Sequence, residues 1–384
     1  MLVDELGESP ILSLIDRIFE LQRRGEPVLG LHIGEPDFAT PEGIREAAYR
    51  AMNEGYTHYA SAQGLPELRA GIAERLAGRH RIPATPDDVV VLPAKFAIYA
   101  TLLATVSAGD EVVLPNPTYL FDQPVRLAGA RPVYVPLGRG FALDPEAIER
   151  ALTPRSRLLV LVTPANPTGR VLRKAEVEAA LTIARDHGLT ILSDETYESL
   201  IYEGHHVAPA ALARGEVPVV TVGSFSKAFA MTGWRCGFAV APPAERARLV
   251  KVMEHTLTCL PPFVQRAAAW ALANAGRDEE RFREKFRERR DHVLARLDDL
   301  PGLTYVRPEG AFYVFPRYEI DLASVEFARR LLEEERVAVV PGVSFGPAGE
   351  HHVRISYSRP PEELDEGLAR LGRFLERHGG RRGA

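Results

Sequence analysis

The chain has 384 residues, of which 46% are hydrophobic and 26% charged, and its formal net charge is -5. A chain of this length is too long for one small core and too apolar to be disordered, so we expect a globular protein with two packed regions. Its 47 basic and 52 acidic residues are spread along the whole length. This balance offers no basic face to nucleic acid or anionic lipid, and it favours chemistry on small molecules.

Cysteine content and the N-terminal residues indicate the compartment. Cys236 and Cys259 are too few to build a disulfide framework. The opening MLVDELGESP lacks the basic and apolar regions of a signal peptide. The long apolar stretch 89–108 is interrupted by Pro93 and Lys95, which indicates a buried strand followed by a helix rather than a membrane span. We therefore expect a cytoplasmic protein with no membrane or nucleic-acid partner.

The elements predicted along the chain indicate an α/β fold. An amphipathic helix near residues 11–24 precedes the loop GEPDFATP. From about residue 88, short β-branched runs alternate with helical stretches, which is typical of a mostly parallel seven-stranded sheet with helices on both faces. The clearest helix is 173–187, which ends at Gly188. The expected strands are 88–92, 111–114, 131–136, 157–163, 189–193, 217–223 and 235–240.

The pattern changes toward the C-terminus. A long charged helix at about 277–298 precedes a hairpin or strand pair around VRPEGAFYVFP, a helix at 323–335, a strand at 352–357 and a final helix. This order predicts a smaller α+β domain with the N-terminal segment folded against it. The expected parts are an N-terminal segment (1–35), a large domain (36–274) and a small C-terminal domain (275–384).

Polar side chains follow three of the expected strands. Asn166, the pair Asp194 and Tyr197, and Lys227 each come just after a strand, and a helix begins after Pro93. In an open α/β sheet, ligands bind beyond the carboxyl ends of the strands. An amide, a carboxylate, a phenol and an amine thus converge on one edge, beside a helix N-terminus that suits a phosphate.

Each of these residues also has an ordinary structural explanation. An aspartate after a strand is more often a cap than a catalytic group, and a lysine in a loop is usually solvated. Lys174, Lys251 and Lys285 fit that description, whereas Lys227 lies among small and apolar residues. Burial would lower the pKa of the Lys227 amine and make it a usable nucleophile. The coincidence of these groups at strand ends favours a catalytic site.

Motifs spread over nearly the whole chain resemble the class I and II aminotransferases, which are fold-type-I pyridoxal-phosphate enzymes. The resemblance implies transfer of an amino group from an amino acid to a 2-oxo acid with pyridoxal phosphate as cofactor. It also implies a homodimer with shared active sites. The motifs are GEPDFATP, YASAQGLPELR, GDEVVLPNPTY, NPTG, SDETY, SFSKAFAMTGWR, EGAFYVFP and HHVRIS.

The resemblance implies a role for each residue around the cofactor ring. Lys227 would carry the cofactor as an imine and, once displaced, would move the substrate Cα proton. Asp194 would pair with the pyridinium nitrogen and keep it protonated. Asn166 and Tyr197 would hydrogen-bond the ring oxygen, and Tyr119 would stack on the ring. Lys227, Asp194 and Tyr197 are thus the expected catalytic residues.

The same resemblance implies a phosphate site. Ser224 and Arg235 would hold the cofactor phosphate together with the backbone amides of Ala94 and Lys95. Tyr59 would reach that phosphate from the partner subunit. The dimer is therefore expected to complete each active site.

For the substrate, the resemblance implies a second group of contacts. Arg354 would grip the α-carboxylate as a bidentate fork, with Gly34 and Asn166 beside it. Lys95 would meet the distal carboxylate of an acidic substrate, but Ile11 stands where the aspartate-using branch has a threonine. Ile11 offers no hydrogen bond and favours an apolar side chain. We therefore expect better kcat/KM with apolar or aromatic donors than with aspartate, and 2-oxoglutarate still usable.

The same residues are compatible with other functions. A β C–S lyase or another carbanion enzyme on the same fold would use the same lysine, aspartate and arginine. The S-x-x-K from Ser224 to Lys227 matches serine acyl-transferases, although the order of their elements is wrong and no K-T-G is present. The doublets His205-His206 and His351-His352 are expected to be solvated, so no metal is expected.

Overall fold

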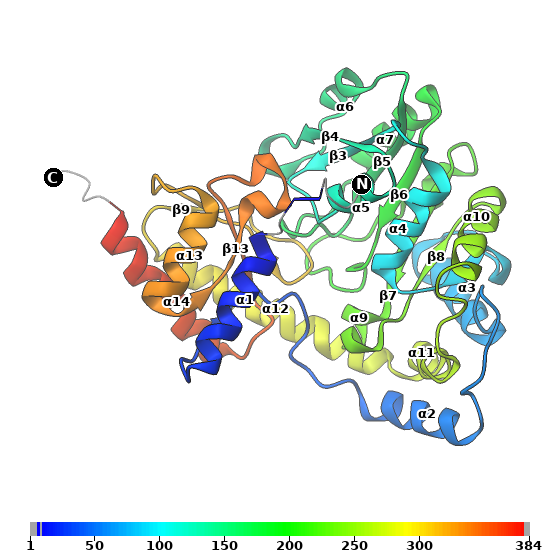
Figure 1. Ribbon diagram of the computed structural model, residues 1–384, viewed down its shortest axis with the longest axis horizontal. Coiled ribbons are helices and arrows are strands. Elements are labelled where there is room, and N and C mark those ends of the chain that lie inside the picture. Colours follow the sequence, from blue (N-terminus) through cyan, green and yellow to red (C-terminus); the bar gives the residue numbers. More distant parts are fainter. Residues whose placement is uncertain (1–5, 8–9, 380–384) are drawn as a thin grey trace.

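The protein's computed structural model describes residues 6–7 and 10–379. Figure 1 shows a twisted sheet with helices around it on one side of the molecule and the C-terminal elements on the other. The N-terminal helix α1 (Pro10–Arg23) lies with the C-terminal elements, although nearly the whole chain separates them in sequence. The predicted association of the N-terminal segment with the C-terminal part is thus visible in the fold.

A seven-stranded sheet forms the centre of the described chain, in the spatial order β2-β8-β7-β6-β5-β3-β4. All neighbours run parallel except β8, which is antiparallel to both β2 and β7. The predicted mostly parallel α/β sheet is therefore confirmed. The strands are β2 (Val89–Val91), β3 (Glu111–Asn116), β4 (Arg131–Pro136), β5 (Ser156–Val162), β6 (Thr190–Asp194), β7 (Val219–Ser224) and β8 (Gly237–Val240).

Two predicted strand starts were too early by two residues, for reasons that lie in the backbone. Strand β7 begins after Pro218, whose nitrogen carries no hydrogen for the ladder. Strand β8 begins after Arg235, which adopts the left-handed conformation with φ 57°. A residue in that conformation cannot continue an extended strand.

Helices cover both faces of the sheet because its strands alternate between two apolar faces. Leu158 and Val160 of β5 pack in the cluster that contains α4 and α10, whereas Leu159 and Leu161 pack with α6 and α7. The helices of this part are α2 (Glu42–Asn53), α3 (Pro66–His80), α4 (Ala94–Thr105), α5 (Asp122–Leu127), α6 (Pro145–Ala151), α7 (Lys174–His187), α8 (Pro209–Ala213), α9 (Phe225–Ala228), α10 (Pro243–Glu254) and α11 (Pro262–Asn274).

Local sequence accounts for the bounds of α7. At its start, the Glu176 carboxylate accepts the backbone N–H of Arg173 at 2.8 Å. At its end, Gly188 adopts φ 64°, the left-handed C-cap conformation that glycine takes without steric cost. The helix predicted at 173–187 is confirmed to within one residue.

The C-terminal part has its own hydrophobic core, built on three helices and several short strands. Strands β10, β14 and β13 form an antiparallel sheet, and β1 runs parallel to β12. The elements are α12 (Gly276–Asp298), α13 (Ser324–Glu335), α14 (Pro361–His378), β1 (Leu29–Gly30), β9 (Leu303–Thr304), β10 (Tyr313–Val314), β11 (Arg317–Tyr318), β12 (Val337–Ala338), β13 (Val340–Pro341) and β14 (Val353–Ser356).

The strand pair expected around VRPEGAFYVFP is confirmed only in part. Strands β9 and β11 pair across this segment, but β10 inside it pairs with β14 instead. Strand β10 is fully buried, and its partner β14 brings Arg354 toward the central sheet. Short-range pattern could not show this partner, because it lies some 40 residues further along the chain.

Helix α1 belongs to the C-terminal part by its contacts. Leu14, Ile18 and Leu21 are buried against Leu332 of α13 and Ala338 of β12. We propose the divisions 1–35, 36–274 and 275–384 for the chain on the basis of this packing and of the core that most of the C-terminal elements share.

The apolar stretch 89–108 contains β2 and α4, and α4 is only 12 residues long. Within residues 6–7 and 10–379, no helix has the length and hydropathy needed to cross a membrane.

Candidate active site

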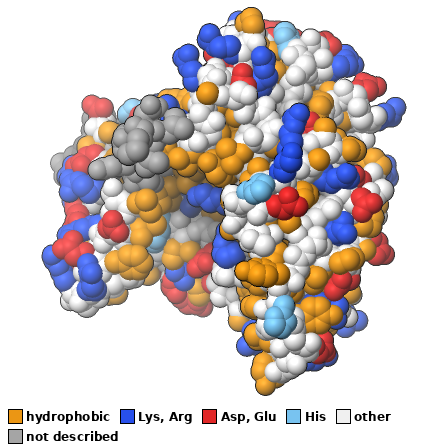
Figure 2. Space-filling model, turned by 45° about the vertical axis from the view of Figure 1, so that its right-hand side comes forward, with side chains coloured by type: hydrophobic (Ala, Val, Ile, Leu, Met, Phe, Trp, Pro, Cys, Tyr) orange, Lys and Arg blue, Asp and Glu red, His pale blue; other side chains and the backbone are white. Residues whose placement is uncertain are grey.

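A cavity of about 420 Å³ lies at the carboxyl ends of β5, β6 and β7, beside the N-terminus of α4. The C-terminal part and the N-terminal segment form its opposite wall, and Figure 2 shows the molecule hollowed between its two parts. The cavity brings together nearly all the residues that the sequence suggested. They are Ile11, Gly34, Ala94, Lys95, Tyr119, Asn166, Asp194, Tyr197, Ser224, Lys227, Arg235 and Arg354.

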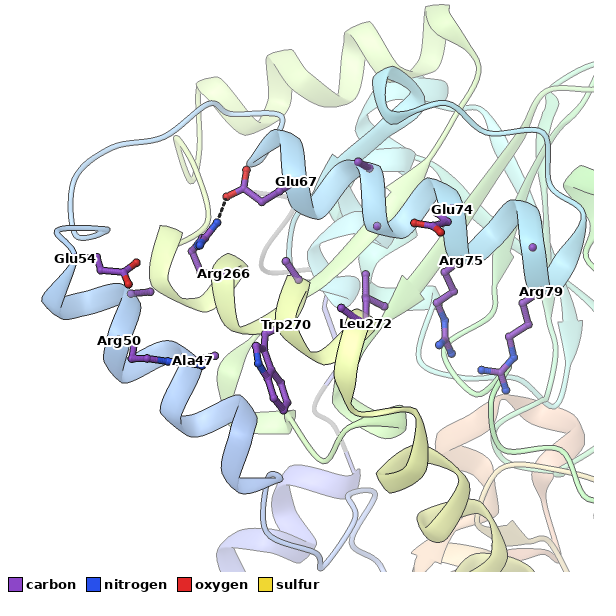
Figure 3. Close-up of a pocket in the computed structure, with 16 residues that line it drawn as sticks. Ala47, Arg50, Glu54, Glu67, Glu74, Arg75, Arg79, Arg266, Trp270 and Leu272 are labelled. Carbon is purple, nitrogen blue, oxygen red and sulfur yellow. Dashed lines mark hydrogen bonds and ion pairs between the residues drawn. The ribbon is translucent and has the colours of Figure 1, made fainter.

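A larger groove of about 1140 Å³ lies elsewhere, between α2, α3 and α11 (Figure 3). Three of the four arginines that line it pair with acidic neighbours. Arg266 donates to Glu67 at 2.9 Å (Figure 3), and Arg75 and Arg79 both donate to Glu279. Because these positive charges already have acidic partners, the groove is less suited to binding an anionic ligand. The smaller cavity therefore remains the candidate active site.

Lys227 lies on α9, directly after β7, and its amine is inside the cavity. Burial lowers the pKa of this amine to about 8, even though the nearby carboxylates of Glu35 and Asp194 act in the opposite direction. Nζ donates to the carbonyl oxygen of Gly34 at 2.5 Å. The lysine thus holds more neutral amine near pH 7 than an exposed lysine does, which suits a nucleophile or base.

Asp194 is the last residue of β6, and its side chain is 7% exposed. Burial raises the pKa of this carboxyl group, while hydrogen bonds from Thr196 oppose the increase. The hydroxyl and backbone N–H of Thr196 both donate to Oδ1, at 2.6 and 3.1 Å. These two bonds fix the orientation of the carboxylate at the cavity.

Arg354 enters the cavity from β14 and is 6% exposed. Its Nη1 donates to Asn166 Oδ1 at 3.1 Å and its Nη2 to the carbonyl oxygen of His32 at 2.7 Å. Among the described residues its Nε is buried without a hydrogen-bond partner, and no ion pair to a carboxylate is formed. The guanidinium carbon stands 4.3 Å from the centre of the Tyr313 ring. A buried cation that lacks a counter-ion is well suited to bind an anionic ligand.

Two buried phenols form the next part of the site. The hydroxyl groups of Tyr197 and Tyr313 are 2.8 Å apart and share a hydrogen bond. Burial raises the pKa of both, so both stay neutral and can donate. Burial likewise raises the pKa of Tyr119 to about 12. All three rings line the cavity together with Asn166.

The end of the cavity at α4 provides the groups expected for a phosphate. The first helical hydrogen bond of α4 runs from Ala97 to Pro93, so the N–H groups of Ala94 and Lys95 have no acceptor within the helix. Gly237 lies so close that an added Cβ would come within 2.9 Å of the Ala94 nitrogen. The helix N-terminus can therefore approach β8 only because glycine stands there. Pro93 itself offers no N–H.

Ser224 and Arg235 lie at the same end. The Ser224 hydroxyl caps the short helix α9 by accepting the Ser226 N–H at 3.1 Å. Arg235 Nη1 donates to the carbonyl oxygen of Thr232 at 2.7 Å, which holds the side chain beside the cavity. A hydroxyl group and a guanidinium thus flank the N-terminus of α4.

One wall of the cavity is apolar. Ile11 and Ile15 of α1 line it together with Ile33, Ile98 and Leu120. Ile15 and Ile33 were not among the predicted residues. The spacing from Ile11 to Ile15 is one helical turn and could have indicated Ile15.

Tyr313, Thr196 and His32 were also missed. Tyr313 lies within the motif EGAFYVFP, and Thr196 lies between two predicted residues, so both motifs contained the signal. His32 is held beside Arg354, and burial lowers the pKa of its imidazole to about 4, with the charge of Arg354 acting in the same direction. Its neighbours come from distant parts of the chain, which sequence pattern does not reveal.

The expected solvation of the doublet His205-His206 is wrong for His206. Its side chain is 4% exposed, and Nε2 lies 2.6 Å from the Glu195 carboxylate. The sequence pattern did not reveal this burial, because it depends on how the loop folds back onto Glu195, which lies 11 residues earlier. His205 is exposed, as expected.

Tyr59 lies outside the cavity, and 88% of its surface is exposed. Its expected contact with a cofactor phosphate involves a partner subunit, so this role stays a prediction.

Comparison with known proteins identifies the relatives of this chain. A family model described as aminotransferase class I and II matches residues 26–371. The chain is 41% identical to an aspartate aminotransferase of Pyrococcus abyssi over 94% of this chain and 95% of that protein. It is 40% identical to aromatic-amino-acid aminotransferase 2 of Thermococcus litoralis over 95% of this chain and 96% of that protein.

A solved structure of Thermus thermophilus aspartate aminotransferase with maleate superimposes with a TM-score of 0.93 at 39% identity, covering 97% of this chain and 98% of that one. These comparisons do not favour the β C–S lyase or the serine acyl-transferase alternative over amino-group transfer.

Proposed function

We propose, because this chain belongs to the aminotransferase class I and II family, that the cavity at the sheet edge is its active site and that Lys227, Asp194 and Arg354 act there. The protein is a pyridoxal-phosphate-dependent aminotransferase that moves an amino group from an amino acid to a 2-oxo acid. One observation carries the assignment of the site. A buried amine with a pKa of about 8 lies in the same cavity as a buried guanidinium that has no carboxylate partner among residues 6–7 and 10–379.

The donor set fits pyridoxal phosphate. When bound, the cofactor supplies an electron sink for the electron pair left when the substrate Cα–H bond breaks. Lys227 offers the amine that holds the cofactor aldehyde, and Asp194 offers a carboxylate for the ring nitrogen. Asn166 and Tyr197 are hydrogen-bond donors for the ring oxygen, and Tyr119 offers an aromatic face.

The phosphate of the cofactor fits the opposite end of the cavity. Ser224, Arg235 and the free N–H groups of Ala94 and Lys95 lie there. A helix N-terminus and a guanidinium both favour a doubly charged anion. This arrangement separates the phosphate end of the cavity from the Arg354 end, where the substrate would bind.

Substrate binding and proton transfer follow from two side chains. Arg354 binds the α-carboxylate, which gives its buried charge a counter-ion and its Nε a hydrogen-bond acceptor. That contact fixes the substrate Cα relative to Lys227. The Lys227 amine would then accept the Cα proton at Nζ. It would later give a proton to the carbon of the cofactor aldehyde group, so one group acts as base and acid.

For the amino donor we propose an apolar or aromatic side chain in preference to that of aspartate. Ile11 and Ile15 form an apolar wall, and Lys95 is the second lysine that lines the cavity. A carboxylate against isoleucine loses hydration without gaining hydrogen bonds. Lys95 keeps 2-oxoglutarate usable as acceptor. The relatives include enzymes named for aspartate and for aromatic amino acids, so both donor classes occur among them.

We also propose a homodimer in the cytoplasm. Large apolar side chains are exposed on α2 and in the loops that follow α2 and α10. Large exposed apolar side chains of this kind suit a contact surface. Both cysteines are free thiols, which suits a reducing compartment. The exposed side chains are Tyr49, Met52, Tyr59 and Leu257.

Reduction of the holoenzyme with borohydride, followed by peptide mapping, tests the site assignment. The pyridoxyl group is expected on Lys227, because its amine is buried and its pKa is lowered. Recovery of the label on Lys95, the other lysine of the cavity, would place the cofactor elsewhere and overturn the assignment.

A further inference from the structure

Two consecutive carboxylates stand at the end of β6 and point to different surroundings. Asp194 lines the cavity, whereas Glu195 lines a small void of about 20 Å³ behind it. Consecutive side chains of a strand point to opposite faces, which explains the separation. Glu195 is 2% exposed, so it is a second buried acid next to the proposed partner of the cofactor ring.

Glu195 is surrounded by hydrogen-bond donors. His206 Nε2 lies 2.6 Å from Oε2, and the hydroxyl groups of Ser193 and Thr221 donate to Oε1 at 2.8 and 3.4 Å. The two hydroxyl groups are neutral. Among these contacts, therefore, only His206 can supply a positive charge to balance the carboxylate.

The surroundings of His206 come from three elements. The His80 ring of α3 lies 4.8 Å away, centre to centre, and its Nε2 is 2.7 Å from the Glu198 carboxylate. Glu198 also accepts from Arg75, whose partner is Glu279 of α12. His80 thus has its own acidic partner.

These neighbours act on His206 in opposite directions. Burial lowers the pKa of His206, and the charge of Arg79 lowers it as well. The charge and the hydrogen bond of Glu195 raise the pKa, as does the charge of Glu198, and their combined effect is larger. The net direction is upward. Nδ1 of His206 is buried without a partner within the described chain. The geometry and the charges therefore agree that His206 is the cation of this pair.

We propose that His206 and Glu195 form a positioning pair in which the imidazolium neutralises the buried carboxylate behind Asp194, so that Asp194 can remain ionised toward the cofactor. The inference rests on the proposed role of Asp194. Besides burial, the charge of Glu195 raises the pKa of Asp194. Without His206, the two neighbouring buried carboxylates would carry two negative charges. The protonated ring nitrogen would balance that of Asp194, and the charge of Glu195 would have no counter-ion.

The test is a pH titration of the absorbance of the bound cofactor in the holoenzyme. His206→Asn keeps a hydrogen-bond donor but removes the positive charge, so the local potential becomes more negative. A more negative site holds the proton of the cofactor chromophore more tightly. The titration midpoint should rise by roughly one pH unit, the effect of one charge over roughly 10 Å at an effective dielectric constant of about 20.

The double variant Glu195→Gln/His206→Asn removes both charges and should return the midpoint to within about 0.3 units of the wild-type value. His80→Asn is the matched control, because His80 pairs with Glu198 instead; its midpoint should stay unchanged. An unchanged midpoint in His206→Asn, or a double variant displaced as far as the single one, overturns the charge-balance role. If His206→Asn fails to fold while the double variant folds, the neutralising role is supported; if both fail, it is overturned.

Asp194→Asn separates this inference from the proposed function. If that variant shifts the midpoint in either direction and His206→Asn leaves it unchanged, Asp194 keeps its role and only the pairing inference fails. If Asp194→Asn has no effect on the midpoint, the assignment of Asp194 to the cofactor ring fails, and the pairing inference fails with it.

Discussion

The amine of Lys227 donates a hydrogen bond to the carbonyl oxygen of Gly34 at 2.5 Å, across 193 residues of sequence. Lys227 follows a strand of the central sheet, whereas Gly34 belongs to the segment that leads from α1 into the large part of the chain. The contact holds the amine inside a cavity whose opposite wall comes from the C-terminal part and the N-terminal segment. Its environment therefore depends on the docking of both parts.

The lowered pKa of Lys227 predicts how the apo-enzyme takes up its cofactor. The neutral amine is the nucleophile, so the rate constant for reaction with pyridoxal phosphate should rise about tenfold per pH unit and level off near pH 8, the pKa that burial produces. Stopped-flow absorbance from pH 6 to 10 measures the profile. Lys174, which is exposed on α7, is the reference when replaced by alanine. A rate that still increases above pH 9.5 would contradict the buried environment.

Replacing Asp194 with asparagine should preserve cofactor binding but slow the removal of the substrate Cα proton by about 100-fold or more. The neutral amide keeps the size of the side chain and the Thr196 hydrogen bonds but cannot hold a proton on the ring nitrogen. Single-turnover half-reactions with Cα-deuterated donor isolate this step. A variant whose proton-transfer rate and isotope effect equal those of the wild type would remove Asp194 from this role.

The apolar wall predicts the donor preference. In a screen at fixed 2-oxoglutarate, phenylalanine, tyrosine and leucine should give higher kcat/KM than aspartate. Ile11→Thr, which introduces a hydroxyl group, should increase the ratio for aspartate over phenylalanine about tenfold. Leu12→Thr is the control, because Leu12 neighbours Ile11 but does not line the cavity and is 61% exposed. Aspartate leading the wild-type series by more than about tenfold would contradict the weight given to Ile11.

Shared active sites predict recovery of activity in mixed dimers. Subunits with Lys227→Ala and subunits with Tyr59→Phe, mixed and re-associated, should form hybrids with one site that lacks both groups and one that is intact. The mixture should regain activity above the sum of the two separate variants. Re-association of each variant with itself provides the baseline. No recovery, with hybrid formation verified by mass spectrometry, would show that Tyr59 acts within its own chain.

The central sheet and the residues at its edge were accessible from sequence because both follow local rules. Buried parallel strands produce β-branched runs, and the residue after each run must lie at the carboxyl edge. Asn166, Asp194 and Lys227 could be placed on that basis. The alternation of side chains along an extended strand and just past its end also predicts that Asp194 and Glu195 face different ways, but it does not tell which of them faces the cavity.

Contacts between distant segments were less accessible. The bonds from Arg354 to Asn166 and to the His32 carbonyl depend on how the C-terminal part docks on the sheet. The burial of His206 by Glu195 and the position of Tyr313 depend on packing of the same kind. Such contacts leave no periodic signal, because each involves single residues from elements far apart in the chain.

The proposed substrate contacts of helix α1 lie on a different element from the proposed proton-transfer residues. Leu14, Ile18 and Leu21 anchor one of its faces to the C-terminal part, while Ile11 and Ile15 form part of the cavity wall. The residues proposed to hold and move protons, Asp194 and Lys227, lie instead at the end of β6 and just after β7. If these roles hold, mutations within this one short helix change the preferred donor and leave the proton-transfer residues in place, so donor preference can change in evolution more quickly than the reaction itself.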